Sequence, residues 1–130
     1  MHKAMLMLLL TVVSSSAAAQ WVRAGNDGEF AHYADLSTTG KTHNSRVRMR
    51  TLIDFKTAQS AAQGITFLSS VTKVEYDCKE GESRDLHTKF YSGNMGRGRV
   101  VHVANNPGAW ESIQPGSMSE ILWRAACRRS

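Results

Sequence analysis

Residues 45–55 read SRVRMRTLIDF, and the alternation along this stretch decides the fold class. Every second position is apolar or small: Val47, Met49, Thr51, Ile53 and Phe55. The positions between them carry most of the charge: Arg46, Arg48, Arg50 and Asp54. Successive side chains of a β-strand point to opposite faces of its sheet, so this period of two predicts a strand with one face on a core and one in water.

The same period recurs along the chain. We expect further strands at residues 21–24, 30–34, 68–78, 84–92 and 99–104. The last has valines at successive positions, which predicts that it is covered on both faces. Turn signals separate the strands, at Gly40 and in residues 25–29, 57–64, 79–82 and 93–98. Consecutive strands joined by short links predict an antiparallel meander of about six strands.

Residues 91–101, YSGNMGRGRVV, combine three glycines with arginines and suggest two readings. A phosphate-binding loop would place such glycines before a helix, so that backbone amides point at the phosphate. Here a valine-rich strand pattern follows. We therefore interpret the stretch as a hairpin loop, in which glycine supplies positive φ or a bulge.

The C-terminal part of the chain changes to a helical period. Ser117 precedes Glu120 by three residues, an arrangement typical of a capping box at the start of a helix. Apolar residues then form a helical stripe: Met118, Ile121, Leu122, Ala125 and Ala126. The sequence therefore predicts an α+β domain, with one C-terminal helix packed on the apolar face of the sheet.

The first nineteen residues are typical of a secretory signal peptide. A basic start and a short apolar run lead to Ala17-Ala18-Ala19, so we expect cleavage before Gln20 and a single domain over residues 20–130. The apolar run is too short to span a bilayer, which takes about 20 residues. No cysteine follows it directly, so we expect an unanchored protein, periplasmic or secreted, without a transmembrane segment.

Both cysteines, Cys78 and Cys127, lie in the exported part. An even count in an oxidising compartment predicts one disulfide, which would tie the helix to the end of a strand. The alternative is two separate buried thiols.

The formal net charge of +5 favours anionic partners. A candidate anion-binding face consists of Arg46, Arg48 and Arg50 from one strand, joined by Arg97 and Arg99 from the hairpin loop. Arg84 and Lys89 would extend it. Acidic polysaccharide or another polyanion is the expected ligand class, and we expect no nucleic acid. The alternative is an ordinary solvated sheet surface.

No motif favours catalysis or a cofactor. The histidines lack metal-binding spacings, and no nucleophile motif is present, so we expect neither a metal site nor a cofactor. A hydrolytic site needs a carboxylate, a histidine and an arginine on one face. Outward positions of neighbouring strands hold one of each: Glu75, Arg84 and His87. Three common residues meet this condition readily by chance, and we expect a protein without enzymatic activity.

Several segments together resemble the surface-adhesin protein E domain family of proteobacteria. They are WVRAG at residues 21–25, VEYDC at 74–78, YSGNMGRGRVV at 91–101 and WESIQPGS at 110–117, followed by the helix with Cys127. The resemblance covers nearly all of the chain from Trp21 to Cys127.

The resemblance implies a curved six-stranded antiparallel sheet with the helix on its concave face. It also implies an exported protein that acts by binding. The best-known member of the family is lipid-anchored, can dimerise, and binds host proteins such as laminin, vitronectin and plasminogen. We therefore expect a non-catalytic binding module with a protein ligand and a homodimer as one state, and, as the alternative, a periplasmic polyanion-binding protein.

Overall fold

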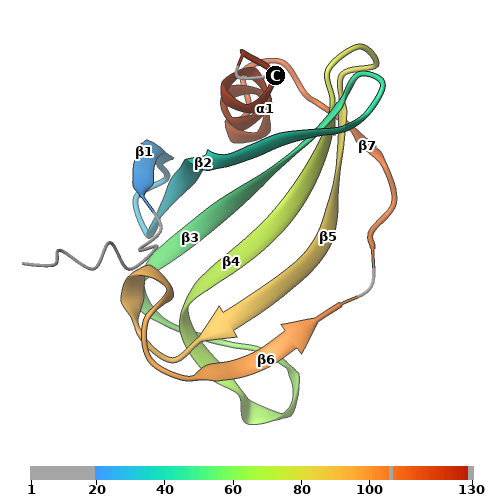
Figure 1. Ribbon diagram of the computed structural model, residues 1–130. Coiled ribbons are helices and arrows are strands. Elements are labelled where there is room, and N and C mark those ends of the chain that lie inside the picture. The colour runs from blue at the N-terminus through green and yellow to red at the C-terminus, as the bar shows by residue number, and fades with distance from the viewer. Residues whose placement is uncertain (1–19, 106, 129–130) are drawn as a thin grey trace, which may run out of the picture.

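The computed structural model describes residues 20–105 and 107–128, and Figure 1 shows one curved sheet with a single α-helix. The predicted signal peptide, residues 1–19, lies outside these ranges. Six strands lie in chain order across the sheet: β1 Trp21–Asn26, β2 Phe30–His43, β3 Arg46–Ser60, β4 Thr66–Asp77, β5 Glu82–Tyr91 and β6 Val100–Ala104. All neighbours pair antiparallel. The predicted α+β class and six-stranded meander are confirmed.

The turn predicted at Gly40 is wrong, because β2 continues through it to His43. The pairing of β2 with β3 shifts register between Asp35 and Gly40, and there the Thr38 hydroxyl accepts the Arg50 amide at 3.0 Å. A side chain thus replaces a bond of the strand ladder, so the polar sequence remains compatible with the sheet. The chain reverses at Asn44 instead, whose φ is 50°.

Three short elements complete the chain. The 3₁₀ turns η1 and η2 span Ala62–Gly64 and Asn94–Gly96. The two-residue strand β7, Glu111–Ser112, pairs with the start of β5, whereas β6 pairs with its end.

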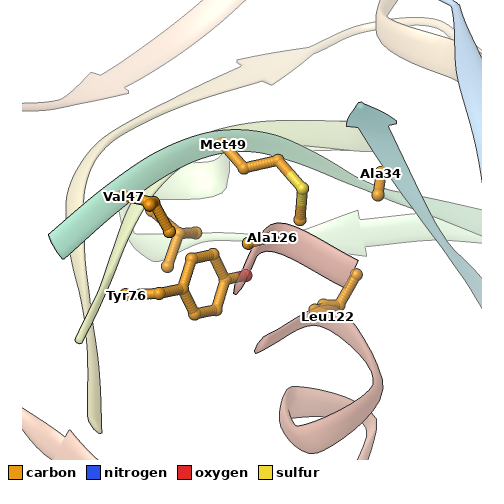
Figure 2. Packing of buried hydrophobic residues seen from close by; sticks show 7 residues of the cluster. Ala34, Val47, Met49, Tyr76, Leu122 and Ala126 are labelled. Carbon is orange, nitrogen blue, oxygen red and sulfur yellow. The ribbon is translucent and has the colours of Figure 1, made fainter. Parts of the chain in front are cut away.

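The helix α1, Met118–Arg128, begins as the capping box predicted. The Ser117 hydroxyl accepts the Glu120 amide at 3.2 Å and satisfies one free donor of the first turn. Figure 2 shows the main core, in which helix residues pack on β2, β3 and β4: Ala34, Val47, Met49, Val74, Tyr76, Leu122 and Ala126. We call this side of the sheet the helix face and the other side the opposite face.

A disulfide joins Cys78, directly after β4, to Cys127 near the end of α1, with their Cα atoms 5.7 Å apart. The predicted pairing is confirmed. The indole of Trp123 donates to the Asp77 carbonyl at 3.1 Å, next to the disulfide. The end of the helix is therefore attached to the end of β4 by one covalent bond and one hydrogen bond.

The opposite face has a small core of its own. Leu52 on β3 and Val71 on β4 are buried, with 0% and 8% of their surface exposed, and they are cross-strand neighbours. The loop between β5 and β6 covers them at Gly96, where an added Cβ would lie 3.3 Å from Val71 and 3.5 Å from Leu52. Gly96 also has φ of 69°, so a larger residue there would be both crowded and strained.

Two side chains of the opposite face hold this loop in place. The Ser69 hydroxyl donates to the Gly93 carbonyl at 2.6 Å and accepts the Gly96 amide at 2.9 Å. The Asp54 carboxylate accepts the Met95 amide at 2.7 Å. The hairpin-loop interpretation of residues 93–98 is thus correct, but the loop is also a lid on the sheet.

The strand β6 is not covered on both faces, contrary to the sequence expectation. Val100 and Val103 are 48% and 46% exposed, and His102 is exposed as well. The valines satisfy the strand preference for β-branched side chains without being buried.

Candidate functional site

A buried carboxylate lies at the centre of the predicted anion face. Glu75 on β4 pairs in register with Arg48 on β3 and Arg84 on β5. Arg84 donates to Glu75 Oε1 at 2.8 and 3.0 Å, and Arg48 Nε donates to Oε2 at 3.2 Å. The Thr42 hydroxyl lies 3.3 Å from Oε2. Glu75 is only 3% exposed, so the expectation that it projects into water is wrong: its arginine neighbours enclose it.

The charge of Glu75 is stabilised by these partners. Burial acts to raise its pKa, but the hydrogen bonds from Arg84 and Arg48 outweigh burial and leave the pKa below its ordinary value. Glu75 and Arg84 therefore do meet, but as an enclosed ion pair, while His87 lies opposite Lys73 in the next row. This arrangement offers no accessible carboxylate for proton transfer.

A second ion pair continues the cluster. Arg46 Nε lies 3.7 Å from Asp77 Oδ2, and the Trp110 ring lies under the guanidinium groups of Arg46 and Arg84, 4.9 and 4.7 Å from its centroid. The Glu80 amide is the largest influence that lowers the pKa of Asp77. Trp110 thus covers this end of the opposite face through cation–π contacts, and Arg46 and Arg48 are both neutralised by carboxylates.

The other predicted arginines lie apart from this cluster. Arg50 has its guanidinium 5.3 Å from the centroid of the Trp21 ring. Arg97 and Arg99 are exposed in the β5–β6 loop, at the Ser69 end of β4. Glu75 lies six positions after Ser69 on β4, or roughly 20 Å along the strand. The structure therefore places Arg46, Arg48 and Arg50 at alternate positions of β3, on one face, and leaves Arg97 and Arg99 apart from them in the loop.

A hollow of about 300 Å³ lies between the Trp110 end and the loop lid. Its lining residues come from β3, β4 and β5: Arg50, Val71, Lys73, His87, Lys89 and Tyr91. Sequence reasoning missed Lys73 and His87 as members of a basic cluster. The signal that identifies them is the strand pairing, in which Arg50 is opposite Lys73 and Lys73 is opposite His87. A register shift between Lys73 and Val74 sets the second pairing, and such a shift is not visible in one sequence.

Aromatic rings form a row across the part of the sheet that α1 leaves uncovered. Successive ring centroids lie 5.7, 5.7, 4.8 and 5.6 Å apart along the row Phe30, Phe55, Phe67, Phe90 and His102. The four phenylalanines are half-buried and His102 is exposed. The row thus crosses five strands and ends at the edge strand β6.

The chain has the architecture of a small domain of one sheet and one helix, and comparison with known proteins identifies its family. Residues 21–128 match the surface-adhesin protein E family, so the chain belongs to that family. None of the curated proteins matches the sequence.

Solved structures with the same fold include those of Haemophilus influenzae protein E. Crystal form II has a TM-score of 0.68 at 12% identity, covering 85% of this chain and 89% of that one. The protein from a non-typeable strain has a TM-score of 0.59 at 14% identity, covering 86% and 76%. At these identities the structural likeness establishes the fold, and the sequence match over residues 21–128 establishes the family.

Membership of this family implies an adhesin-like protein that is exported or displayed at a surface. Within the part of the chain that the structure describes, no helix is long and apolar enough to cross a membrane.

Proposed function

We propose that this protein is an exported, non-catalytic module that binds a protein partner through the edge strand β6. One observation carries the proposal: the edge strand β6 presents exposed valines, Val100 and Val103, on the opposite face, and His102, the end of the aromatic row, on the helix face. Large exposed apolar side chains beside an edge strand favour association with another chain. Family membership supports the same class of function.

The strand β6 pairs with β5 on one side and ends the sheet on the other. A partner segment in extended conformation would add to this edge, with main-chain hydrogen bonds supplying affinity and alternate side chains supplying specificity. Partner side chains on the helix face would continue the aromatic row beyond His102. The homodimer expected from the family resemblance would use the same edge and compete with a foreign partner.

The test measures binding of the mature domain to immobilised laminin, vitronectin and plasminogen, the proteins that the family resemblance suggests. The double variant V100K/V103K should weaken binding at least tenfold, because it removes apolar contact and adds charge at the edge. Val22 on the other edge strand, β1, is 51% exposed and offers a matched control as Val22→Lys.

The control should bind like the wild-type protein. Equal binding by the double variant and the wild type, with both folded by circular dichroism, would reject the β6 edge. Absence of binding to all three proteins would reject this ligand class.

We also infer that export removes residues 1–19 and leaves a periplasmic or secreted domain without a lipid anchor. Mass spectrometry of the protein recovered from fractionated cells should give a chain that begins at Gln20. An intact N-terminus or an attached acyl chain would contradict this inference.

The alternative, a polyanion-binding face built on Arg46, Arg48 and Arg50, has less support. Arg46 and Arg48 are paired with Asp77 and Glu75, so a long polyanion would have to compete with carboxylates already in place. The unpaired cations lie elsewhere on the same face.

A further inference from the structure

The hollow on the opposite face holds three cations without a carboxylate partner. Arg50, Lys73 and Lys89 all line it, and none has an ion pair among the residues described. By contrast, the three arginines at the Trp110 end are each within 4 Å of an acidic group. Of these two groups on the same face, the arginines at the Trp110 end are therefore neutralised and the cations of the hollow are not.

The strand pairing makes this arrangement unfavourable in the empty protein. Arg50 lies directly opposite Lys73, and like charges in directly opposed positions destabilise a sheet. The nearest acidic group in the same row is Asp35, which pairs with Arg50 in register. Asp35 is 1% exposed and bonded to the backbone amide of Ser37 at 3.1 Å, so it does not reach into the hollow.

The other lining groups complete a small site. His87 lies opposite Lys73, and its Nδ1 is buried without a hydrogen-bond partner among the residues described. Arg50 is held by its contact with the Trp21 ring. Val71 and Tyr91 add apolar and aromatic surface.

We propose that this hollow binds a phosphate or sulfate ester carried by a small molecule or a sugar unit. A phosphate ester carries about −1.5 to −2 charge at pH 7 and has three strong acceptor oxygens, which matches three cations and an imidazole better than a single carboxylate does. The volume of about 300 Å³ lies at the lower end of the range for small-molecule sites, roughly 300–1,000 Å³, and has room for one phosphorylated sugar.

This site goes beyond the protein-binding function proposed above and is independent of it. The two sites are neighbours but use different side chains: Lys89 and Tyr91 line the hollow, and their cross-strand partners Val103 and Val100 belong to the edge strand β6. The variant V100K/V103K adds two cations beside the hollow and should not weaken anion binding, whereas K73Q/K89Q leaves both valines in place, so failure of one proposal is distinguishable from failure of the other.

The experiment titrates inorganic phosphate, inorganic sulfate and glucose 6-phosphate into the mature domain by calorimetry, at low and at moderate salt. A parallel arm uses phosphatidylcholine vesicles with and without phosphatidic acid, to distinguish a free or sugar-borne ester from a lipid head group. Each saturating probe should also raise Tm, because a ligand that binds only the folded state stabilises it.

The variant K73Q/K89Q removes two cations from the hollow, and R97Q/R99Q removes the same charge from the exposed loop. The first should weaken binding at least tenfold and lose the ligand-dependent rise in Tm, since hydrogen bonds to charged groups are the stronger class. The second should change affinity less than twofold. Neither variant removes a core side chain, so both should fold.

Saturable binding of any ester probe that K73Q/K89Q loses and R97Q/R99Q retains supports the proposal. Absence of saturable binding by all probes overturns it, as does equal weakening by the two variants, which would indicate attraction to net charge alone.

Discussion

The bond between Cys78 and Cys127 gives the sharpest stability prediction. It closes a segment with a sequence separation of 49 residues. On the chain-entropy model, opening a loop of this length lowers the free energy of unfolding by about 4 kcal/mol. A domain of this size has a total stability of about 5–15 kcal/mol, so the bond contributes a large share.

The corresponding change in Tm follows from the size of the domain. Unfolding entropy is about 2.1 cal/mol/K per residue, so for roughly 110 residues about 4 kcal/mol lowers Tm by roughly 17 °C. The double variant C78S/C127S and the chemically reduced wild-type protein should both show this decrease by circular dichroism. Reduction keeps both sulfur atoms, which controls for the packing of the side chains.

The measurement is made on samples whose free thiols have been counted. A decrease in Tm of less than about 5 °C in the fully reduced protein would refute the entropy argument, because the predicted effect is about three times larger. A large decrease in the double variant alone would assign the effect to packing beside the helix.

Three further predictions concern single groups. Leu52→Ala should lower the free energy of unfolding by about 2–5 kcal/mol in urea, because it empties the buried space beneath the loop lid; a change under about 1 kcal/mol would disprove that second core. Ser117→Ala should cost about 1 kcal/mol by removing the helix cap, whereas Ser119→Ala, an exposed site within the first turn, should cost less than half as much; equal losses would argue against the cap. Glu75 and Asp77 have lowered pKa values in the folded protein, so the folded protein binds fewer protons than the unfolded chain at acidic pH. The stability that these two carboxylates contribute should therefore be retained above their ordinary pKa values of 4.5 and 3.8, and lost as the pH falls below those values. Urea midpoints that do not decrease between about pH 7 and about pH 3 would contradict this sign.

The local features of the fold were predictable from the sequence where one period or one motif determines the structure. The alternation around Met49 predicts the strand β3, and Ser117 with Glu120 predicts the start of the helix. The even number of cysteines predicts the disulfide. The length of β2 was not predictable. Its polar residues read as a turn at Gly40, and the bond from Arg50 to Thr38 that keeps them in the sheet depends on a neighbouring strand.

The candidate surfaces depend on relations between strands, and one sequence does not contain those relations. The arginines of β3 were recognised as one face, but their state depends on which residue lies opposite: Arg48 faces Glu75, whereas Arg50 faces Lys73. The loop lid was interpreted as a turn because its role arises from contacts with Leu52 and Val71, far away in the chain. The residue types were sufficient to predict a basic surface, but the strand pairing was needed to show which of its cations are neutralised and which are not.

The helix and the loop lid cover the sheet at diagonally opposed corners, one at the Tyr76 end of the helix face and the other at the Ser69 end of the opposite face. The fold is therefore maintained by two buried patches, and these patches share few side chains with the hollow or with the edge strand β6. Val71 belongs both to the hollow and to the buried pair beneath the loop lid, but the charged residues of the hollow and the valines of β6 can change without emptying a core, and a solved structure with this architecture is only 12% identical.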